Sequence, residues 1–186
     1  MDIKFENSNI VYLVEEVVLS IVDIAKDKNI EIIFNTEEEE IITAIDEEKI
    51  VRVILILLSN SIKFSKEKGD ICVEMRREDE EVVIKVTDNG IGINEDMKEK
   101  IFDKFKRVQS LSNLNVDHEG SGLGLYIAKG FIELHNGSIS VVSEVEKGST
   151  FIITIPIVII KNDLHNINHM DEDELNRIIK IELSDL

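Results

Sequence analysis

The sequence predicts an α/β fold, and two kinds of apolar periodicity predict it. Apolar residues recur at helical spacing after Asn9 and again from Asp46 to about Phe64, as in helices with one buried face. Later stretches such as Val82 to Thr87 alternate apolar with charged or polar residues, as half-buried strands require. With 186 residues, 43% of them hydrophobic, the chain suits one domain with a substantial core.

The N-terminal part is predicted to hold one helix and two strands. Met1 to Ser8 are expected to be the frayed end of an upstream segment. An amphipathic helix from Asn9 is expected to bury Val11, Val14, Val18, Ile21 and Ala25. Ile30 to Asn35 and Ile41 to Ile45 are predicted strands, and the acidic turn that joins them, residues 36–40, is expected to be a solvated loop.

A second helix is predicted from Asp46 to about Phe64. Asp46 is a good N-cap, and Glu47 and Glu48 stand in the first turn, where the helix dipole favours negative charge. The expected buried side consists of Ile50, Val53, Ile54, Leu57 and Leu58.

The same apolar stripe places the carboxamide of Asn60 on a mainly apolar face. Left unpaired, it would cost about 1 to 3 kcal/mol, so Asn60 needs nearby backbone, a polar ligand or the shell of a metal ion. Lys63, three residues on, is either an ordinary exposed lysine or placed to meet a phosphate.

Two hairpins are predicted after this helix. Asp70 to Arg77 pairs with Val82 to Thr87, and near the end of the chain Ser138 to Ser143 pairs with Ser149 to Ile155. Cys72, the single cysteine, is expected to be a small core side chain, which leaves neither a disulfide nor a thiolate metal site.

Two further segments are less regular. Asn94 is expected to cap a short helix that runs to about Lys100. After Lys161 the chain is polar and acidic, and its default interpretation is a partly ordered appendage. Its apolar positions fit either a helix stripe or a terminal strand: Leu175, Ile178, Ile179, Ile181 and Leu183.

The motif Asp88-Asn89-Gly90-Ile91-Gly92 follows a predicted strand. A carboxylate there can accept a hydrogen bond from an exocyclic amine such as that of adenine, and the glycines allow backbone to approach a flat ligand closely. Asp-Asn-Gly is also common turn chemistry, so the motif by itself leaves a plain turn open.

A glycine-rich loop, Gly120-Ser121-Gly122-Leu123-Gly124-Leu125, leads into a helix that carries Ile127, Phe131 and Leu134. Amides exposed at a helix N-terminus favour an anion such as a triphosphate, although a flexible hinge would have the same composition. The glycine spacing differs from that of dinucleotide-binding loops, and no early βαβ unit contains it.

The net charge of −17 argues against nucleic acid or an anionic membrane surface as a main partner. A nucleotide can still bind where a divalent cation and a few basic side chains reverse the local field. Neither a secretory signal nor a membrane-spanning stretch is evident, since the most apolar segment, Phe151 to Ile160, is too short to span.

Asn60 on a helix, Asp88-x-Gly-x-Gly after a strand and the glycine loop before a helix stand in one order. This ordered set resembles the catalytic and ATP-binding domain of sensor histidine kinases, within the superfamily shared with DNA gyrase, heat-shock chaperone and mismatch-repair ATPases. The resemblance covers roughly Asn9 to Ile160. Residues 57–64 match the family's N box and Asp88 to Gly92 its G1 box. Phe102 to Arg107 match the F box, residues 120–125 the G2 box and residues 148–150 the terminal glycine motif.

The resemblance implies roles for individual residues. Asn60 would coordinate Mg²⁺, Lys63 would contact a phosphate, and Asp88 would specify adenine. Catalytic roles fall on Asn60, Lys63, Lys104 and Arg107. ATP contacts fall on Asn60, Lys63, Phe64, Asp88, Gly90, Gly92, Ile93, Phe105, Gly120, Ser121, Gly122, Leu123, Gly124, Leu125 and Thr150.

The family also implies a fold and partners. The expected fold is a two-layer α/β sandwich over residues 1–160, with a mixed sheet covered on one face by three helices, followed by an acidic tail at residues 161–186. The nucleotide would lie between the helices and a mobile lid at residues 108–119. The implied activity transfers the γ-phosphoryl group of ATP to a histidine on a separate helical dimerisation domain. A response regulator is the implied downstream partner. The fragment is expected to be monomeric and cytoplasmic, without membrane contact of its own, although a full-length kinase can be membrane-anchored.

The chain departs from the family pattern at two positions and lacks a phospho-accepting histidine, and the first departure, Ile56, keeps a second interpretation open. Ile56 stands where the kinases have asparagine and the ATPases a base-supplying glutamate, and Lys104 stands where arginine is common. None of His118, His135, His165 and His169 lies in a phospho-accepting context. The alternative is a catalytically weak nucleotide-sensing module that docks to a partner when ATP binds. A self-contained hydrolase ranks third.

Overall fold

The computed structural model describes residues 2–66, 68–105, 122–161, 169–184 and 186. The chain forms, in order, β1 (Glu6–Asn9), α1 (Ile10–Asp27), β2 (Glu31–Thr36), β3 (Ile42–Ile45), α2 (Glu47–Phe64), β4 (Asp70–Glu78), β5 (Glu81–Asp88), two 3-10 turns (Glu95–Met97 and Lys100–Phe102), α3 (Gly124–Leu134), β6 (Ser138–Glu144), β7 (Gly148–Pro156) and α4 (Glu172–Glu182).

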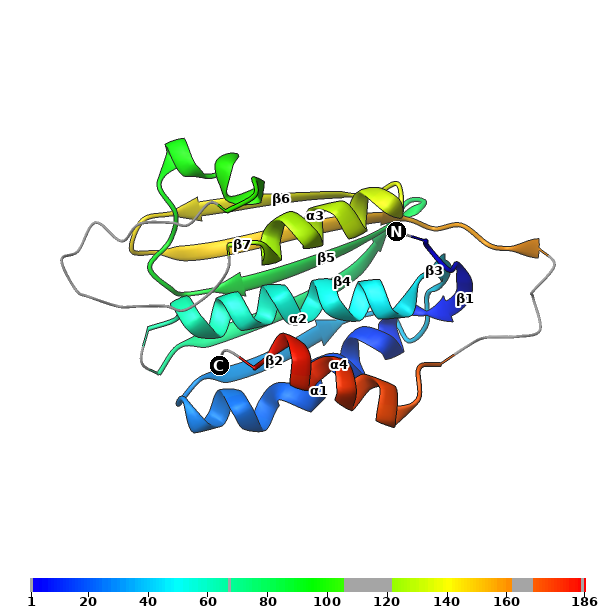
Figure 1. Ribbon diagram of the computed structural model, residues 1–186, viewed down its shortest axis with the longest axis horizontal. Coiled ribbons are helices and arrows are strands. Elements are labelled where there is room, and N and C mark those ends of the chain that lie inside the picture. The colour runs from blue at the N-terminus through cyan, green and yellow to red at the C-terminus, as the bar shows by residue number, and fades with distance from the viewer. Residues whose placement is uncertain (1, 67, 106–121, 162–168, 185) are drawn as a thin grey trace.

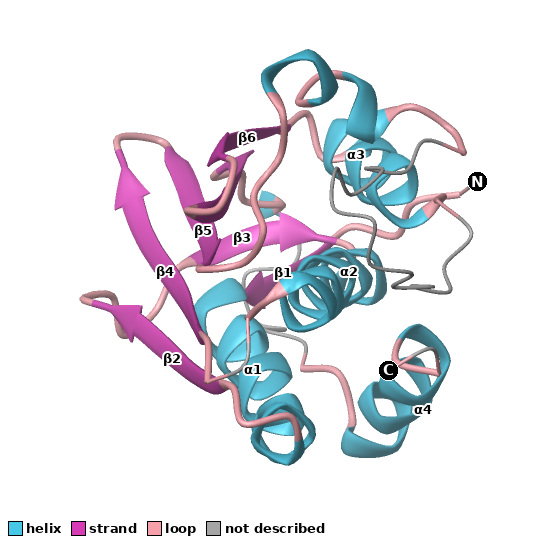
Figure 2. Ribbon diagram, turned by 90° about the vertical axis from the view of Figure 1, so that its left-hand side faces the viewer, coloured by secondary structure: helices cyan, strands magenta, loops and turns pink. Residues whose placement is uncertain are grey.

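The main sheet has five strands in the order β2-β4-β5-β7-β6 (Figure 1). β2 and β4 are parallel, whereas the other neighbouring strands are antiparallel, so the sheet is mixed. Helices α1, α2 and α3 lie together on one face of it (Figure 2). This arrangement confirms the predicted two-layer α/β fold, and both predicted hairpins form.

The core lies between this helix layer and the inner face of the sheet. Ile71, Val73 and Met75 of β4 point inward and are at most 3% exposed. Cys72 lies between two of these residues, so the period of two along a strand turns it to the outer face. Its thiol is only half-buried, and the carboxamide of Asn35 lies 3.5 Å from Sγ. The prediction of a core cysteine is therefore wrong.

The predicted frayed N-terminus contains a strand. β1 pairs antiparallel with β3 in a separate two-stranded sheet, so β2 and β3 belong to different sheets. The carboxamide of Asn7 exchanges hydrogen bonds with the backbone of Ile160, with Nδ2 to O at 3.0 Å and N to Oδ1 at 2.9 Å. Asn9 then caps α1 by accepting from the amide of Val11. Polar side chains, rather than apolar alternation, hold this strand.

Helix α2 is buried on two sides because α4 packs against it from outside the helix layer (Figure 2). Leu175, Ile178 and Ile179 of α4 are at most 9% exposed. Arg52 of α2 pairs with Glu182 of α4 at 3.6 Å. Of the two alternatives for the tail, the helix is therefore correct from Glu172 to Glu182. The described helices include none that is both long and apolar enough to cross a bilayer.

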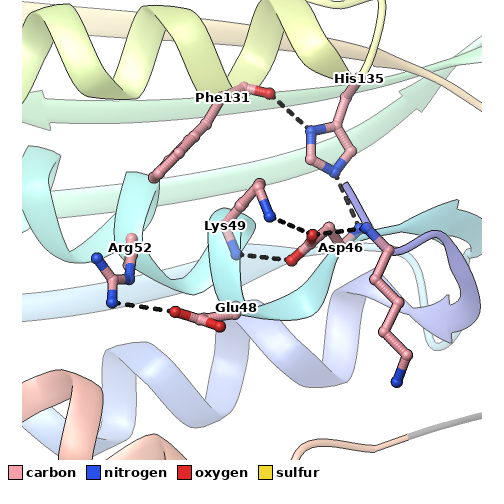
Figure 3. Close-up of polar contacts among 7 residues, drawn as sticks. Asp46, Glu48, Lys49, Arg52, Phe131 and His135 are labelled. Carbon is pink, nitrogen blue, oxygen red and sulfur yellow. Dashed lines mark hydrogen bonds and ion pairs between the residues drawn. The ribbon is translucent and has the colours of Figure 1, made fainter. Parts of the chain in front are cut away.

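Helices α2 and α3 run antiparallel, and the end of α3 is bonded to the start of α2 (Figure 3). α3 buries Ala128, Phe131 and Ile132, whereas Ile127 and Leu134 remain 38% exposed. Of the three apolar residues named for this helix from the sequence, only Phe131 is therefore buried. His135, which follows α3 and is 3% exposed, continues the buried side.

Candidate nucleotide-binding site

Asp88 is the last residue of β5 and is only 6% exposed. Its Oδ1 accepts from the amides of Gly90 (2.9 Å) and Ser149 (3.3 Å). Its Oδ2 accepts from the hydroxyl of Ser61 on α2 at 3.3 Å. Burial raises the pKa of the Asp88 carboxyl, and these hydrogen bonds oppose that rise. The predicted adenine-binding carboxylate is thus held in one orientation by three separate segments.

The glycines of the predicted G1 box meet the protein's own backbone. A Cβ added to Gly90 would lie 2.3 Å from the carbonyl oxygen of Phe64, which also accepts from the amide of Ile91. Gly92 has φ of 69°, and a Cβ there would lie 2.0 Å from the carbonyl oxygen of Glu144. Close packing of the loop onto α2 and β6 therefore accounts for both glycines without a ligand.

A group of serines supports the loop, and the sequence reasoning did not single it out. Ser143 Oγ accepts from the amide of Ile93 at 2.8 Å and lies 2.9 Å from Ser149 Oγ. Ser143 also donates to the carbonyl oxygen of Gly148 at 2.8 Å. Together these bonds fix Ile93 and the start of β7 beside Asp88.

Thr150 lies on the other side of the sheet. β7 pairs with β5 so that Ser149 stands opposite Asp88 and Thr150 opposite Thr87. The hydroxyls of Thr150 and Thr87 lie 3.1 Å apart. The structure therefore brings Ser149 to the carboxylate, whereas Thr150, predicted as an ATP contact, lies beside Thr87. The alternation with buried Phe151 and Ile153 along β7 was a signal that could have assigned these faces.

The last turns of α2 carry Asn60, Lys63 and Phe64, all half-buried. Within the described residues, the Asn60 carboxamide forms no hydrogen bond and the Lys63 ammonium forms no ion pair. Of the partners expected for Asn60, nearby backbone is therefore not used. Both side chains remain open to a ligand at the end of the helix where Ser61 contacts Asp88.

The F and G2 boxes are only partly described. Lys104 Nζ lies 4.8 Å from the centre of the Tyr126 ring. Phe105 is 72% exposed, and its amide donates to the carbonyl oxygen of Gly122 at 3.1 Å, which joins the two boxes. Arg107, Gly120, Ser121 and the predicted lid at residues 108–119 lie outside the described residues.

The N-terminus of α3 lies against Ile56 of α2. Leu123 precedes the helix as its N-cap residue, and Gly124 and Leu125 begin it. A Cβ added to Gly124 would lie 3.2 Å from Ile56 Cγ2, and Ile56 is only 7% exposed. The position of the family's polar residue is therefore filled by an apolar side chain packed against Gly124.

Comparison with known proteins places this arrangement in a family. The family model described as histidine kinase-, DNA gyrase B-, and HSP90-like ATPase matches residues 45–159. Histidine kinase P4 of Formosa agariphila is 34% identical over 167 residues, which are 83% of this chain and 12% of that protein. The sensor histidine kinase WalK of Bacillus subtilis is 35% identical over 136 residues, which are 72% of this chain and 22% of WalK. The chain thus spans a minor part of these relatives.

Solved structures agree with the sequence comparison. The nucleotide-free catalytic domain of histidine kinase ThkA superposes with a TM-score of 0.72 at 30% identity, covering 83% of this chain and 96% of that domain. The region matched by the family model contains Asn60, Asp88 and α3. The chain therefore belongs to the histidine kinase-, DNA gyrase B-, and HSP90-like ATPase family, as a catalytic domain of the histidine kinase type.

Proposed function

We propose that this domain binds ATP with Mg²⁺ and transfers the γ-phosphoryl group to a histidine on a separate helical dimerisation domain. The observation that carries the proposal is the buried Asp88 carboxylate, oriented by Ser61 of α2 and by the start of β7. It lies at the same end of α2 as the open side chains of Asn60 and Lys63. Groups that could recognise a base and neutralise phosphates thus lie together at the C-terminal end of α2.

The donor groups fit this ligand. Asp88 would accept from the exocyclic amine of adenine, and Lys63 would contact a phosphate. The free carboxamide oxygen of Asn60 suits Mg²⁺, which prefers oxygen ligands and retains waters. Bound Mg²⁺ would neutralise charge on the phosphate oxygens. Lys104, whose ammonium lies beside Tyr126, would add positive charge near the start of α3.

The acceptor and downstream partner come from the kinase relationship. The transfer would break the bond between the γ-phosphorus and its bridging oxygen, form a bond from that phosphorus to a histidine nitrogen, and release ADP. A response regulator is the proposed recipient of the group, since ThkA has been solved in complex with response regulator protein TrrA. We place the domain in the cytoplasm, where ATP and such regulators occur.

Ile56 favours a second candidate function. Its apolar side chain lies beneath Gly124, where the family more often has a polar group. A domain that binds ATP without transferring phosphate would act as a nucleotide sensor, docking to a partner in its ATP-bound form.

One experiment separates these candidates. The chain is mixed with the matching helical domain and γ-labelled Mg-ATP, and acid-labile phosphohistidine is measured. The kinase proposal expects labelling that Asn60→Ala removes and that Asn35→Ala, on the outer part of β2, leaves unchanged. Tight ATP binding without labelling would favour the sensor.

A further inference from the structure

We propose that Ser61 is a positioning residue for base recognition, acting through the orientation of the Asp88 carboxylate. This inference rests on the proposed function, because it assumes that Asp88 receives a nucleotide base. Ser61 lies within the residues that match the N box, but it is absent from the predicted ligand set, so the inference gives it a role of its own.

The hydrogen bonds at Asp88 are distributed unequally between its oxygens. Oδ1 has two donors, the amides of Gly90 and Ser149, whereas Oδ2 has one, the hydroxyl of Ser61. A carboxylate oxygen accepts about two hydrogen bonds, so Oδ1 is saturated and Oδ2 retains one acceptor position. An incoming amine would therefore bind Oδ2, and Ser61 determines which side of that oxygen remains open.

Ser61 is also the one side chain among these three donors. The amides of Gly90 and Ser149 are supplied by the backbone, whatever residues stand there, provided that the loop and β7 keep their positions. Ser61 is 1% exposed and lies on the helix that presents Asn60 and Lys63. Ser61 thus connects the base-recognising strand with the helix expected to face the phosphates.

The groups around Asp88 leave little else to orient it. Ser61 faces it from α2, Ser149 from β7 and Gly90 from its own loop, while Ile71 of β4 stands opposite in register. No charged side chain among the described residues contributes to the pKa of Asp88. Within the described part of the chain the Ser61 donor therefore has no substitute at Oδ2, and its loss would raise the pKa of Asp88 further and leave the carboxylate free to rotate.

Titration calorimetry with ATP and Mg²⁺ from pH 5 to 8 tests this role. Ser61→Ala should weaken ATP binding roughly tenfold near neutral pH, as expected for a lost hydrogen bond to a charged group. It should also raise, by up to about one pH unit, the midpoint at which binding is lost on acidification. Ser59→Ala is the matched control, because Ser59 is also a buried serine of α2 and has no bond to Asp88. It should change neither quantity.

The outcomes distinguish this inference from the proposed function. If wild-type protein fails to bind ATP, both are overturned. If wild type binds and Ser61→Ala shows the same affinity and the same pH midpoint, only the role of Ser61 is wrong. A loss of affinity without a shift of the pH midpoint would also overturn the role of Ser61, because a general destabilisation of α2 would lower the affinity in the same way. Should Ser61→Ala not fold, Ser61→Cys keeps the side-chain size with a weaker donor and is judged by the same two quantities.

Discussion

The imidazole of His135 accepts a hydrogen bond from the backbone amide of Asp46 at 3.0 Å through Nε2 (Figure 3). Nδ1 therefore carries the proton and donates to the carbonyl oxygen of Phe131 at 2.7 Å. Asp46 caps α2 and also binds the ammonium of Lys49 and the amide of Lys4. The neutral form of one buried histidine thus connects the end of α3 to the start of α2.

Acidification is expected to weaken this connection. Burial lowers the pKa of His135 below its ordinary value, so the unfolded chain takes up the proton first as the pH falls below about 6.5. The contribution of His135 to the free energy of unfolding should therefore be complete above that pH. Below it, this contribution should decline by at most about 1.4 kcal/mol per pH unit. Urea unfolding at pH 7.5 and 5.5 measures the decline.

His135→Gln provides the comparison, since glutamine does not titrate. It should be less stable than wild type at pH 7.5 but lose less stability on acidification. Glu47 and Glu182 have raised pKa values, so their protonation stabilises the fold and opposes the histidine at lower pH. These groups are common to both proteins and cancel in the difference. Equal pH dependence in the two proteins would contradict the assignment.

Asp88→Asn should abolish or severely weaken ATP binding while leaving the fold intact. The amide keeps the size of the side chain but replaces an ionised acceptor with a group that has only one acceptor oxygen. Since the carboxylate accepts three hydrogen bonds in the structure, a moderate loss of stability is expected as well. Calorimetry at neutral pH measures the affinity, and circular dichroism checks the fold. Near-normal affinity in a folded variant would remove Asp88 from the base site.

Gly148→Ala should destabilise the domain by more than 1 kcal/mol. Gly148 has φ of 99°, and a Cβ there would lie 2.0 Å from the carbonyl oxygen of Asp88, so both strain and collision oppose the change. Gly130→Ala is the control, because nothing lies within 4 Å of its Cβ position and it stands inside α3. That variant should gain about 0.5 to 1 kcal/mol from helix propensity. Thermal unfolding of the two variants beside wild type would reveal the opposite signs.

The isolated chain should bind Mg-ATP yet neither label itself on histidine nor hydrolyse ATP at more than a trace rate. Phosphoryl transfer depends mainly on an aligned nucleophile and on charge stabilisation. The four histidines lack a phospho-accepting context, and buried Ile56 cannot orient an attacking water. Labelled-phosphate release and phosphohistidine are the measurements. Brisk turnover that disappears in Asn60→Ala would instead indicate a self-contained ATPase.

Residue periodicity predicted the elements whose burial is regular. The start of α1 at Asn9, the cap at Asp46 and the apolar stripes of both helices are local features, and the structure agrees with them. The strand β1 could not be predicted this way, because Glu6 to Asn9 has no apolar alternation and depends on Asn7 contacting Ile160. α4 was ambiguous because its apolar positions fit both periods, and packing against α2 selects the helix.

The candidate site was predicted in part for similar reasons. Asp88 follows from a strand end and a glycine motif, which are local in sequence. Ser61 and Ser149 take part through tertiary contacts, and the hydrogen bond from Ser149 to Asp88 spans 61 residues. The face of Cys72 was misjudged because neighbouring residues of β4 competed for the inward position. Burial of Ile71 and Val73 on the inner face of β4 turns Cys72 to the outer face.

The pairing of β5 with β7 has a consequence for biosynthesis. Asp88 leaves the ribosome long before Ser149, so one of its donors and the whole strand beside it are missing while 61 further residues are added. Contacts of this sequence separation close late, because ordering the intervening chain costs entropy. A nascent chain that ends before β7 thus holds an incomplete base pocket. The proposed binding of nucleotide is therefore expected to follow the pairing of β7 with β5, late in folding.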